Sequence, residues 1–130
     1  MTVGIGSGSG AFLAPGVRAT PGTLTIQGPL TFNADSTYNV DLKTTRSTAD
    51  KAVAHGVTIN SNAHFSFNPL GNGTLPLGTT FTIIDNTAAT AIAGVFTNLP
   101  NGSTITAGNN TLQVNYQGGD GNNLTLTVVQ

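Results

Sequence analysis

The sequence contains no cysteine, no glutamate and no tryptophan among its 130 residues. The absence of cysteine excludes a disulfide framework, a thiolate zinc site and a cysteine nucleophile. Charged residues make up only 7% of the chain, against a usual ~25%, and the formal net charge is −1. A chain without a basic field is not expected to bind nucleic acid. No apolar run approaches the roughly 20 residues of a membrane span, so we expect no membrane insertion.

The chain is instead rich in threonine, asparagine and glycine, with 22, 14 and 17 residues respectively. Its length suits one domain with a sizeable core. Lys and Glu normally keep protein surfaces apart and protect the edges of sheets. Hydroxyl and amide side chains do neither, and they lose little side-chain entropy on contact. This composition therefore predicts a surface that packs against similar material.

Apolar and polar residues alternate with a period of two in eight short segments, which is the pattern of half-buried strands. These segments are 24–26, 30–32, 38–42, 57–59, 65–67, 81–83, 112–116 and 124–128. Helix formers are scarce, and only residues 48–55 have the composition for a helical turn. We therefore predict an all-β fold.

The close spacing of the first strands favours a parallel arrangement. Only residues 27–29 separate two apolar segments, and Pro29 lacks the N–H needed inside a ladder. Strands and corners at this pitch predict a parallel β-helix-like solenoid, with a β-sandwich as the alternative. Segments 111–116 and 123–129 are expected to pair as an antiparallel hairpin that caps the solenoid.

The predicted organisation has a short leader followed by one domain. Residues 1–10 are rich in Gly and Ser and predict a flexible leader, in which Val3 and Ile5 alternate as in a strand donated to another subunit. They have no basic region or long apolar run, so we do not expect them, as they stand, to be a secretory signal. Residues 11–130 form the single β domain, with a coil over about 11–70, a cap over about 71–130 and the division near 69–78.

Several segments resemble, in order, the autotransporter-associated β-strand repeat proteins. Residues 13–16 read LAPG, 21–26 read PGTLTI and 28–32 read GPLTF, similar to the family pattern LxPG…PGTLTIxGxLT. Further similar segments follow at 36–42, 50–59, 78–86, 95–100 and 116–126.

This resemblance implies a right-handed parallel β-helix exposed on a bacterial surface, with an adhesive or scaffolding role and no catalysis. The sequence departs from the family at Ala52 and His55, which stand where apolar β-formers are usual. No membrane barrel follows Gln130, so we expect a passenger segment or an independently exported relative. The family implies no ligand.

Two groupings have the residue types of metal sites. Residues 118–123 resemble one calcium-binding nonapeptide, but Asp120 supplies a single carboxylate where about 6–8 oxygens are needed. His55 and His64, with Asp50, have transition-metal ligand types but a spacing that matches no motif. A glycine-rich turn and solvated histidines are the favoured interpretations, and we assign no metal ligand.

No catalytic arrangement is present in the sequence. It has no G-x-S-x-G elbow and no phosphate-binding glycine loop. The five Asp residues are interpreted as turn and solvation residues, although a polysaccharide-cleaving enzyme would need two of them facing each other in a groove. We assign no catalytic residue and no cofactor, and predict that the protein is not an enzyme.

Most aromatic residues are in phase with Leu, Ile and Val and are predicted to lie in the core. These are Phe32, Tyr38, Phe65, Phe67, Phe81, Phe96 and Tyr116. Phe12 has no such pattern. Four Asn-x-Ser/Thr sequons are expected to mark exposed loops, at Asn72, Asn101, Asn109 and Asn123.

The sequence thus predicts a non-catalytic extracellular module of the bacterial cell surface. Its expected partners are copies of itself or neighbouring β-repeats, joined by β-strand addition into fibres. The alternative is a carbohydrate-binding module, which requires Phe12, Tyr38 or Tyr116 to be exposed on a flat polar face.

Overall fold

A computed structural model describes residues 1–4, 11–15, 21–119 and 121–130 of the chain. These residues form strands and no helix, which confirms the predicted all-β class. The strands are β1 (Thr2–Val3), β2 (Ala11–Leu13), β3 (Thr23–Thr25), β4 (Leu30–Phe32), β5 (Ser36–Lys43), β6 (Thr48–Ala49), β7 (Lys51–Ala54), β8 (Val57–Ile59), β9 (His64–Leu70), β10 (Thr80–Asn86), β11 (Thr104–Ala107), β12 (Asn110–Gly118) and β13 (Asn123–Val128). Residues 48–55, the one segment considered for a helical turn, belong to β6 and β7 and the residues beside them. With no helix present, the described residues offer none that could span a membrane.

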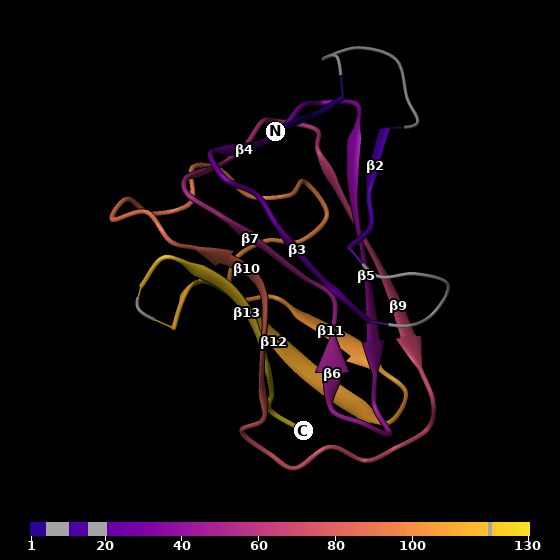
Figure 1. Cartoon of the computed structure of the whole chain (residues 1–130). Coiled ribbons are helices and arrows are strands. Elements are labelled where there is room, and N and C mark those ends of the chain that lie inside the picture. Colours follow the sequence, from indigo (N-terminus) through magenta and orange to yellow (C-terminus); the bar gives the residue numbers. More distant parts are fainter. Residues whose placement is uncertain (5–10, 16–20, 120) are drawn as a thin grey trace.

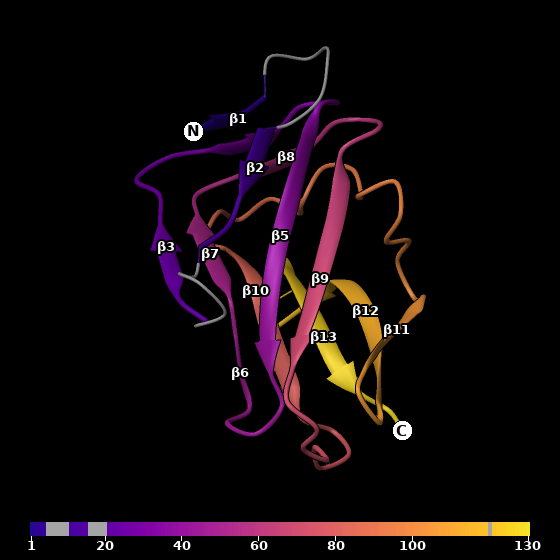
Figure 2. The same ribbon diagram turned by 90° about the vertical axis from the view of Figure 1, so that its right-hand side faces the viewer.

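The strands form three sheets, none of which closes on itself (Figures 1 and 2). One sheet has the order β1-β4-β8, with parallel pairing throughout. The second places β5 between β2 and β9 in parallel, and β6 folds back antiparallel to the end of β5. The third has the order β11-β12-β13-β10-β7-β3, in which β3, β7 and β10 are parallel.

The parallel pairings among β1–β5 and β7–β9 have a nearly regular separation along the chain, whereas β7 and β10 pair with an offset of 32 residues. Thr2 pairs with Thr31, Ala11 with Ser36 and Thr23 with Lys51, so partners lie 25–29 residues apart. The following pairings, β4 with β8 and β5 with β9, both have an offset of 27 residues. Successive stretches of this length therefore lie beside one another in all three sheets.

An asparagine ladder links the corners that follow β1, β4 and β8. Asn60 Nδ2 donates to Asn33 Oδ1 at 2.9 Å, and Asn33 Nδ2 donates to the carbonyl of Gly4 at 2.9 Å. Stacked amides of this kind satisfy each other's polar groups where the chain turns.

The second half of the chain forms the antiparallel portion of the third sheet, from β10 to β13. The predicted hairpin is confirmed, because β12 and β13 pair antiparallel with Gln113 opposite Thr127. β10 carries both kinds of pairing, since residues 80–84 pair with β13 and residues 84–86 pair with β7. The change from parallel to antiparallel pairing along the third sheet therefore falls on β10.

The core is built from the apolar positions of the alternating segments. The alternation places Tyr38, Val40 and Leu42 inside on β5, all fully buried. The predicted burial of the aromatic residues is confirmed except for Phe67, which is half-buried. Phe96 comes from a loop, and its ring centroid lies 5.1 Å from that of Phe32 and 5.9 Å from that of Phe65.

The loop that carries Phe96 covers the exposed edges of β8 and β9. The N–H of Ile59 donates to the carbonyl of Ala93, and Ala93 pairs in parallel with Thr58. Asn98 acts as a substitute for a strand, because its Oδ1 accepts from the N–H of Phe65 at 2.7 Å and its Nδ2 donates to the Phe65 carbonyl at 2.6 Å. The loop therefore supplies partners for backbone groups that an edge strand leaves open.

Two sequence-based expectations about polar residues are wrong. Asn123, expected in an exposed loop, is buried, and its Oδ1 accepts a hydrogen bond from the N–H of Asn86 at 3.0 Å. The other three sequon asparagines are exposed. Asp50, expected to be a turn or solvated residue, is buried with 1% of its surface exposed.

Candidate functional site

The first strand of each sheet is an open edge in the described part of the chain. β1, β2 and β3 each pair on one side only, with β4, β5 and β7 respectively. None of the residues in these three strands carries a charge. They therefore present backbone donors and acceptors without the charged side chains that usually prevent edge pairing. Of the predicted leader, Thr2 and Val3 pair with β4 of the same chain, and residues 5–10 lie outside the described residues.

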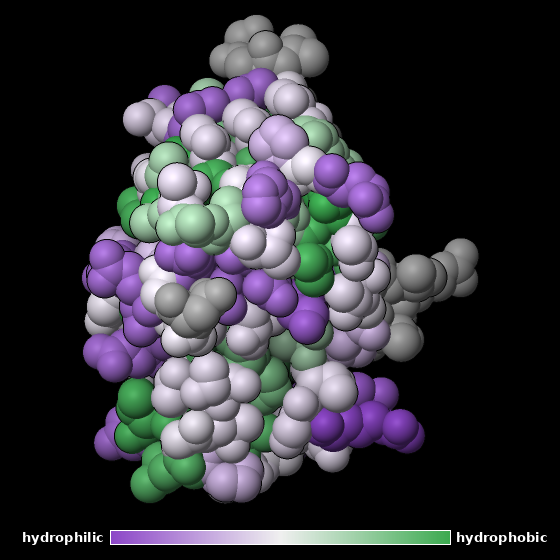
Figure 3. Space-filling view, turned by 60° about the vertical axis from the view of Figure 1, so that its left-hand side comes forward, coloured by the Kyte–Doolittle hydropathy of each residue, from purple (hydrophilic) through white to green (hydrophobic). Residues whose placement is uncertain are grey.

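The outer faces of the sheets carry rows of uncharged side chains. Thr2, Thr31 and Thr58 occupy one register position across the first sheet. In the antiparallel part, the Thr80 and Thr127 hydroxyls lie 3.1 Å apart, and Thr127 is opposite Gln113. Figure 3 shows one face of the molecule, on which many pale residues of intermediate hydropathy lie between purple and green ones. The composition predicted this kind of surface.

The residues considered for a metal site are not gathered in one place. His55 Nδ1 lies 3.2 Å from the Thr87 hydroxyl, while His64 is exposed at the start of β9 opposite Thr37. Across the described ranges, no three His, Asp, Glu or Cys residues lie close enough to hold a metal ion. Asp120 of the calcium-like segment lies outside the described residues.

Asp50 has a structural position between two sheets. Its Oδ1 accepts from the N–H of Gly22 at 2.8 Å, and its Oδ2 accepts from the N–H of Asp41 at 2.9 Å. Hydrogen bonds from backbone N–H groups to a charged carboxylate are stronger than those to a neutral acceptor. It ties the chain before β3 to the middle of β5. Sequence reasoning missed this role because an aspartate that bridges distant segments and an aspartate in a turn have the same local sequence, next to a strand.

The two tyrosines are buried and do not form an exposed aromatic platform. The Tyr38 hydroxyl donates to the carbonyl of Ile83, and the Tyr116 hydroxyl donates to that of Leu99 at 2.7 Å. Burial, and after it the charge of Asp50, raises the pKa of Tyr38 above its ordinary value of 10.0. Burial raises the pKa of Tyr116 to about 12. Of the three candidate platform residues only Phe12 is exposed, with 64% of its surface accessible.

These tyrosines predict a loss of stability in alkali. Between pH 10 and pH 12 the unfolded chain loses tyrosine protons that the folded chain keeps, so the free energy of unfolding falls as pH rises. Each tyrosine contributes a slope of at most about 1.4 kcal/mol per pH unit. Urea unfolding followed at successive pH values, together with tyrosinate absorbance, measures the effect. Tyr116→Phe is expected to reduce the slope, and an unchanged slope would contradict the assignment.

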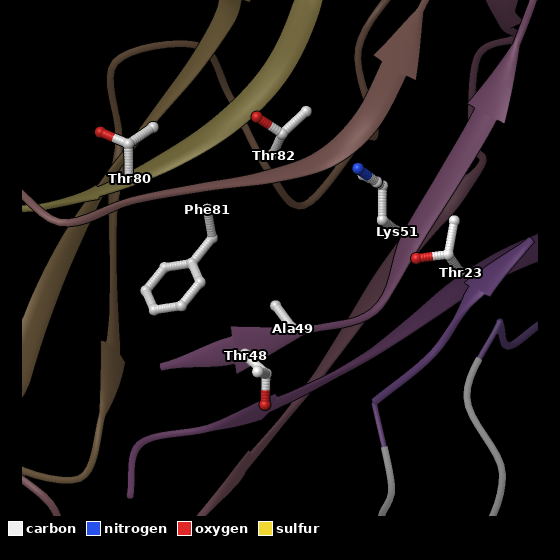
Figure 4. A pocket seen from close by; sticks show the side chains of 7 residues that line it. All are labelled: Thr23, Thr48, Ala49, Lys51, Thr80, Phe81 and Thr82. Carbon is white, nitrogen blue, oxygen red and sulfur yellow. The ribbon is translucent and has the colours of Figure 1, made fainter. Parts of the chain in front are cut away.

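A hollow of about 320 Å³ lies between β10 on one side and β3, β6 and β7 on the other (Figure 4). It is lined by Thr23, Thr48, Ala49, Lys51, Thr80, Phe81 and Thr82. The sequence offered no sign of this hollow, because its walls come from segments separated by up to about 60 residues. The described residues that line it include no Asp, so they do not supply the carboxylate pair of a polysaccharide-cleaving enzyme.

Comparison with protein-family models, curated proteins and solved structures finds no match for this chain. The resemblance to autotransporter-associated repeats therefore depends on the residues quoted for it.

Proposed function

We propose that this chain is a non-catalytic structural or adhesive module of the bacterial cell surface, related to the autotransporter-associated β-strand repeats. It associates with copies of itself or with neighbouring β-repeats by β-strand addition, and continued addition produces fibres. The observation that carries this proposal is the set of open, uncharged edges of β1, β2 and β3. An edge of this kind is a template for another strand.

The proposal includes a right-handed parallel β-helix-like solenoid in which the three sheets are the walls. It is supported by the offset of 25–29 residues in the parallel pairings among β1–β5 and β7–β9, which is what successive turns of one coil would produce. The asparagine ladder at Gly4, Asn33 and Asn60 supports it too, because it repeats at the same interval. In this arrangement β11–β13 and the loop around Phe96 act as the cap, and β1–β3 form the end that receives another repeat.

Replacing Thr25 by proline is expected to weaken self-association. The bonds of this segment to β7 use the carbonyl of Gly22 and the N–H of Ile26, and backbone groups alternate sides along a strand, so the Thr25 N–H points to the open edge. Proline removes that donor and is tolerated on an edge strand. Light scattering over a concentration series and electron micrographs measure the association, which Thr25→Pro should shift towards monomer.

Thr25→Val is the matched control, because it removes the hydroxyl but keeps the N–H. It should associate like the unmodified chain, with circular dichroism showing the same β fold in both variants. A wild-type chain that stays monomeric at high concentration and shows no fibres would contradict the proposal.

A second candidate function, carbohydrate binding at an exposed aromatic, is favoured by Phe12 alone. Phe12 shares its register position with Thr37 and His64 on the outer face of the β2-β5-β9 sheet. If the unmodified chain binds to a glycan array and the Phe12→Ala variant does not, carbohydrate binding would be favoured over self-association.

A further inference from the structure

The hollow beside β10 exists because two neighbouring strands separate. β10 pairs with β7 only from Ile84 onwards, opposite Ala52. Before that point Thr80 to Thr82 have β13 on one side, and the hollow on the other. β6 lies across the hollow and pairs only with β5. Its volume of about 320 Å³ is at the lower end of the roughly 300–1,000 Å³ of ligand pockets.

The lining of the hollow is rich in threonine hydroxyl groups. Hydroxyls come from Thr23, Thr48 and Thr82, and none of these three makes a side-chain hydrogen bond within the described chain. A hydroxyl both donates and accepts, so several of them suit a ligand that also carries hydroxyl groups. Phe81 points to the opposite side of β10 from Thr80 and Thr82 (Figure 4), and with 6% of its surface exposed its ring belongs to the core.

Among the described residues that line the hollow, Lys51 is the only charged one. Its side chain is half-buried and extends towards Thr82 (Figure 4), and it makes no ion pair or hydrogen bond with any described residue. The neighbouring Asp50 does not line the hollow, and its oxygens accept from the N–H groups of Gly22 and Asp41. An ammonium group only donates hydrogen bonds, so its complement is an anion. None of the described lining residues has a carboxylate, so none of them repels an anion.

We propose that this hollow binds a single negatively charged sugar unit, with Lys51 at its anionic group and the threonine hydroxyls at the ring hydroxyls. The ligand is a polyhydroxylated ring that carries one anionic group. That group is either a carboxylate or a sulfate ester, and the titrations below distinguish the two. This site is distinct from the open edges of β1–β3 and does not depend on self-association.

The chain is well suited to a direct test because Lys43 and Lys51 are its only lysines. Lys43 lies on β5 opposite Leu70 and is not part of the hollow, so it serves as an internal control. Glucuronate, glucose 6-sulfate, glucose and acetate are titrated separately at constant ionic strength, and the side-chain ε-CH₂ signals of both lysines are followed by NMR.

We expect a saturable shift of the Lys51 signal with glucuronate, with glucose 6-sulfate or with both, and no shift of Lys43. Whichever of these two sugars binds more tightly identifies the anionic group that the site prefers. Glucose and acetate should bind at least about tenfold more weakly, since each lacks one part of the recognised chemistry. No shift, equal binding of acetate, or equal movement of both lysines would overturn the proposal.

A pair of variants tests the same site without using lysine signals. Lys51→Gln should weaken binding of the preferred sugar at least about tenfold, since it removes the charge-assisted contact. Lys43→Gln should leave the affinity unchanged. Binding is followed at the backbone amide signals of residues 80–82, which line the hollow. Equal affinity of the Lys51→Gln variant and the unmodified chain would overturn the proposal.

Discussion

Replacing Phe96 by alanine is expected to lower the free energy of unfolding by about 3–5 kcal/mol. The Phe96 side chain is fully buried, and its ring meets those of Phe32, Tyr38 and Phe65 at centroid distances of 5.1, 6.0 and 5.9 Å. Alanine leaves a cavity where these rings met, and the close packing of the sheets around it limits collapse. Urea unfolding curves of the two proteins measure the difference.

A second reason for a large effect is that Phe96 anchors the loop over β8 and β9. Its N–H donates to the Tyr116 hydroxyl at 3.1 Å. The same loop supplies the partners of Ile59 and Phe65 through Ala93 and Asn98. Loosening the loop therefore exposes two sheet edges as well as the cavity.

Phe12→Ala is the control of the same residue type. Phe12 lies on the edge strand β2 and is 64% exposed, so its loss should change the free energy of unfolding by no more than about 0.5 kcal/mol. Similar losses in the two variants would show that Phe96 does not occupy the centre of the aromatic cluster.

Replacing Asp50 by asparagine is expected to lower the free energy of unfolding by about 2–4 kcal/mol. The change keeps the shape of the side chain but replaces one acceptor oxygen with an NH₂ donor. Either Gly22 or Asp41 then has its backbone N–H facing another donor in a buried site, and the charge that strengthened both hydrogen bonds is lost. Thermal and urea unfolding measure the loss.

Asp85→Asn removes the same charge at a different place. Asp85 lies on β10, is half-buried and makes no side-chain hydrogen bond with a described residue, so a change within about 0.5 kcal/mol is expected. If Asp50→Asn is equally mild, the carboxylate does not tie β3 to β5 as described.

Local alternation was sufficient to predict most of the strands and which side of each is buried. Val40 and Val114 face the core because successive side chains point to opposite sides of a strand. The hairpin of β12 and β13 was predictable for a similar reason, since both strands and their short connection lie within one stretch of sequence. Each of these inferences needs only neighbouring residues.

The same local information does not place segments that meet across long separations. Asp50 and Asp85 look alike in the sequence, yet of the two only Asp50 is enclosed, because the chain just before β3 and strand β5 bring two backbone N–H groups to it. Phe96 was predicted to be buried, but its role as the centre of the cluster depends on three strands from the first half of the chain.

By itself, the sequence determined the all-β class, the uncharged outer surface and the apolar face of each strand, because composition and a period of two act residue by residue. Only the tertiary structure decided which strands pair, which edges remain open and where β7 and β10 separate to leave the hollow at Lys51. The physical reason is that those features depend on contacts between residues some 25 to 60 positions apart, whose free energy exists only once the sheets have assembled.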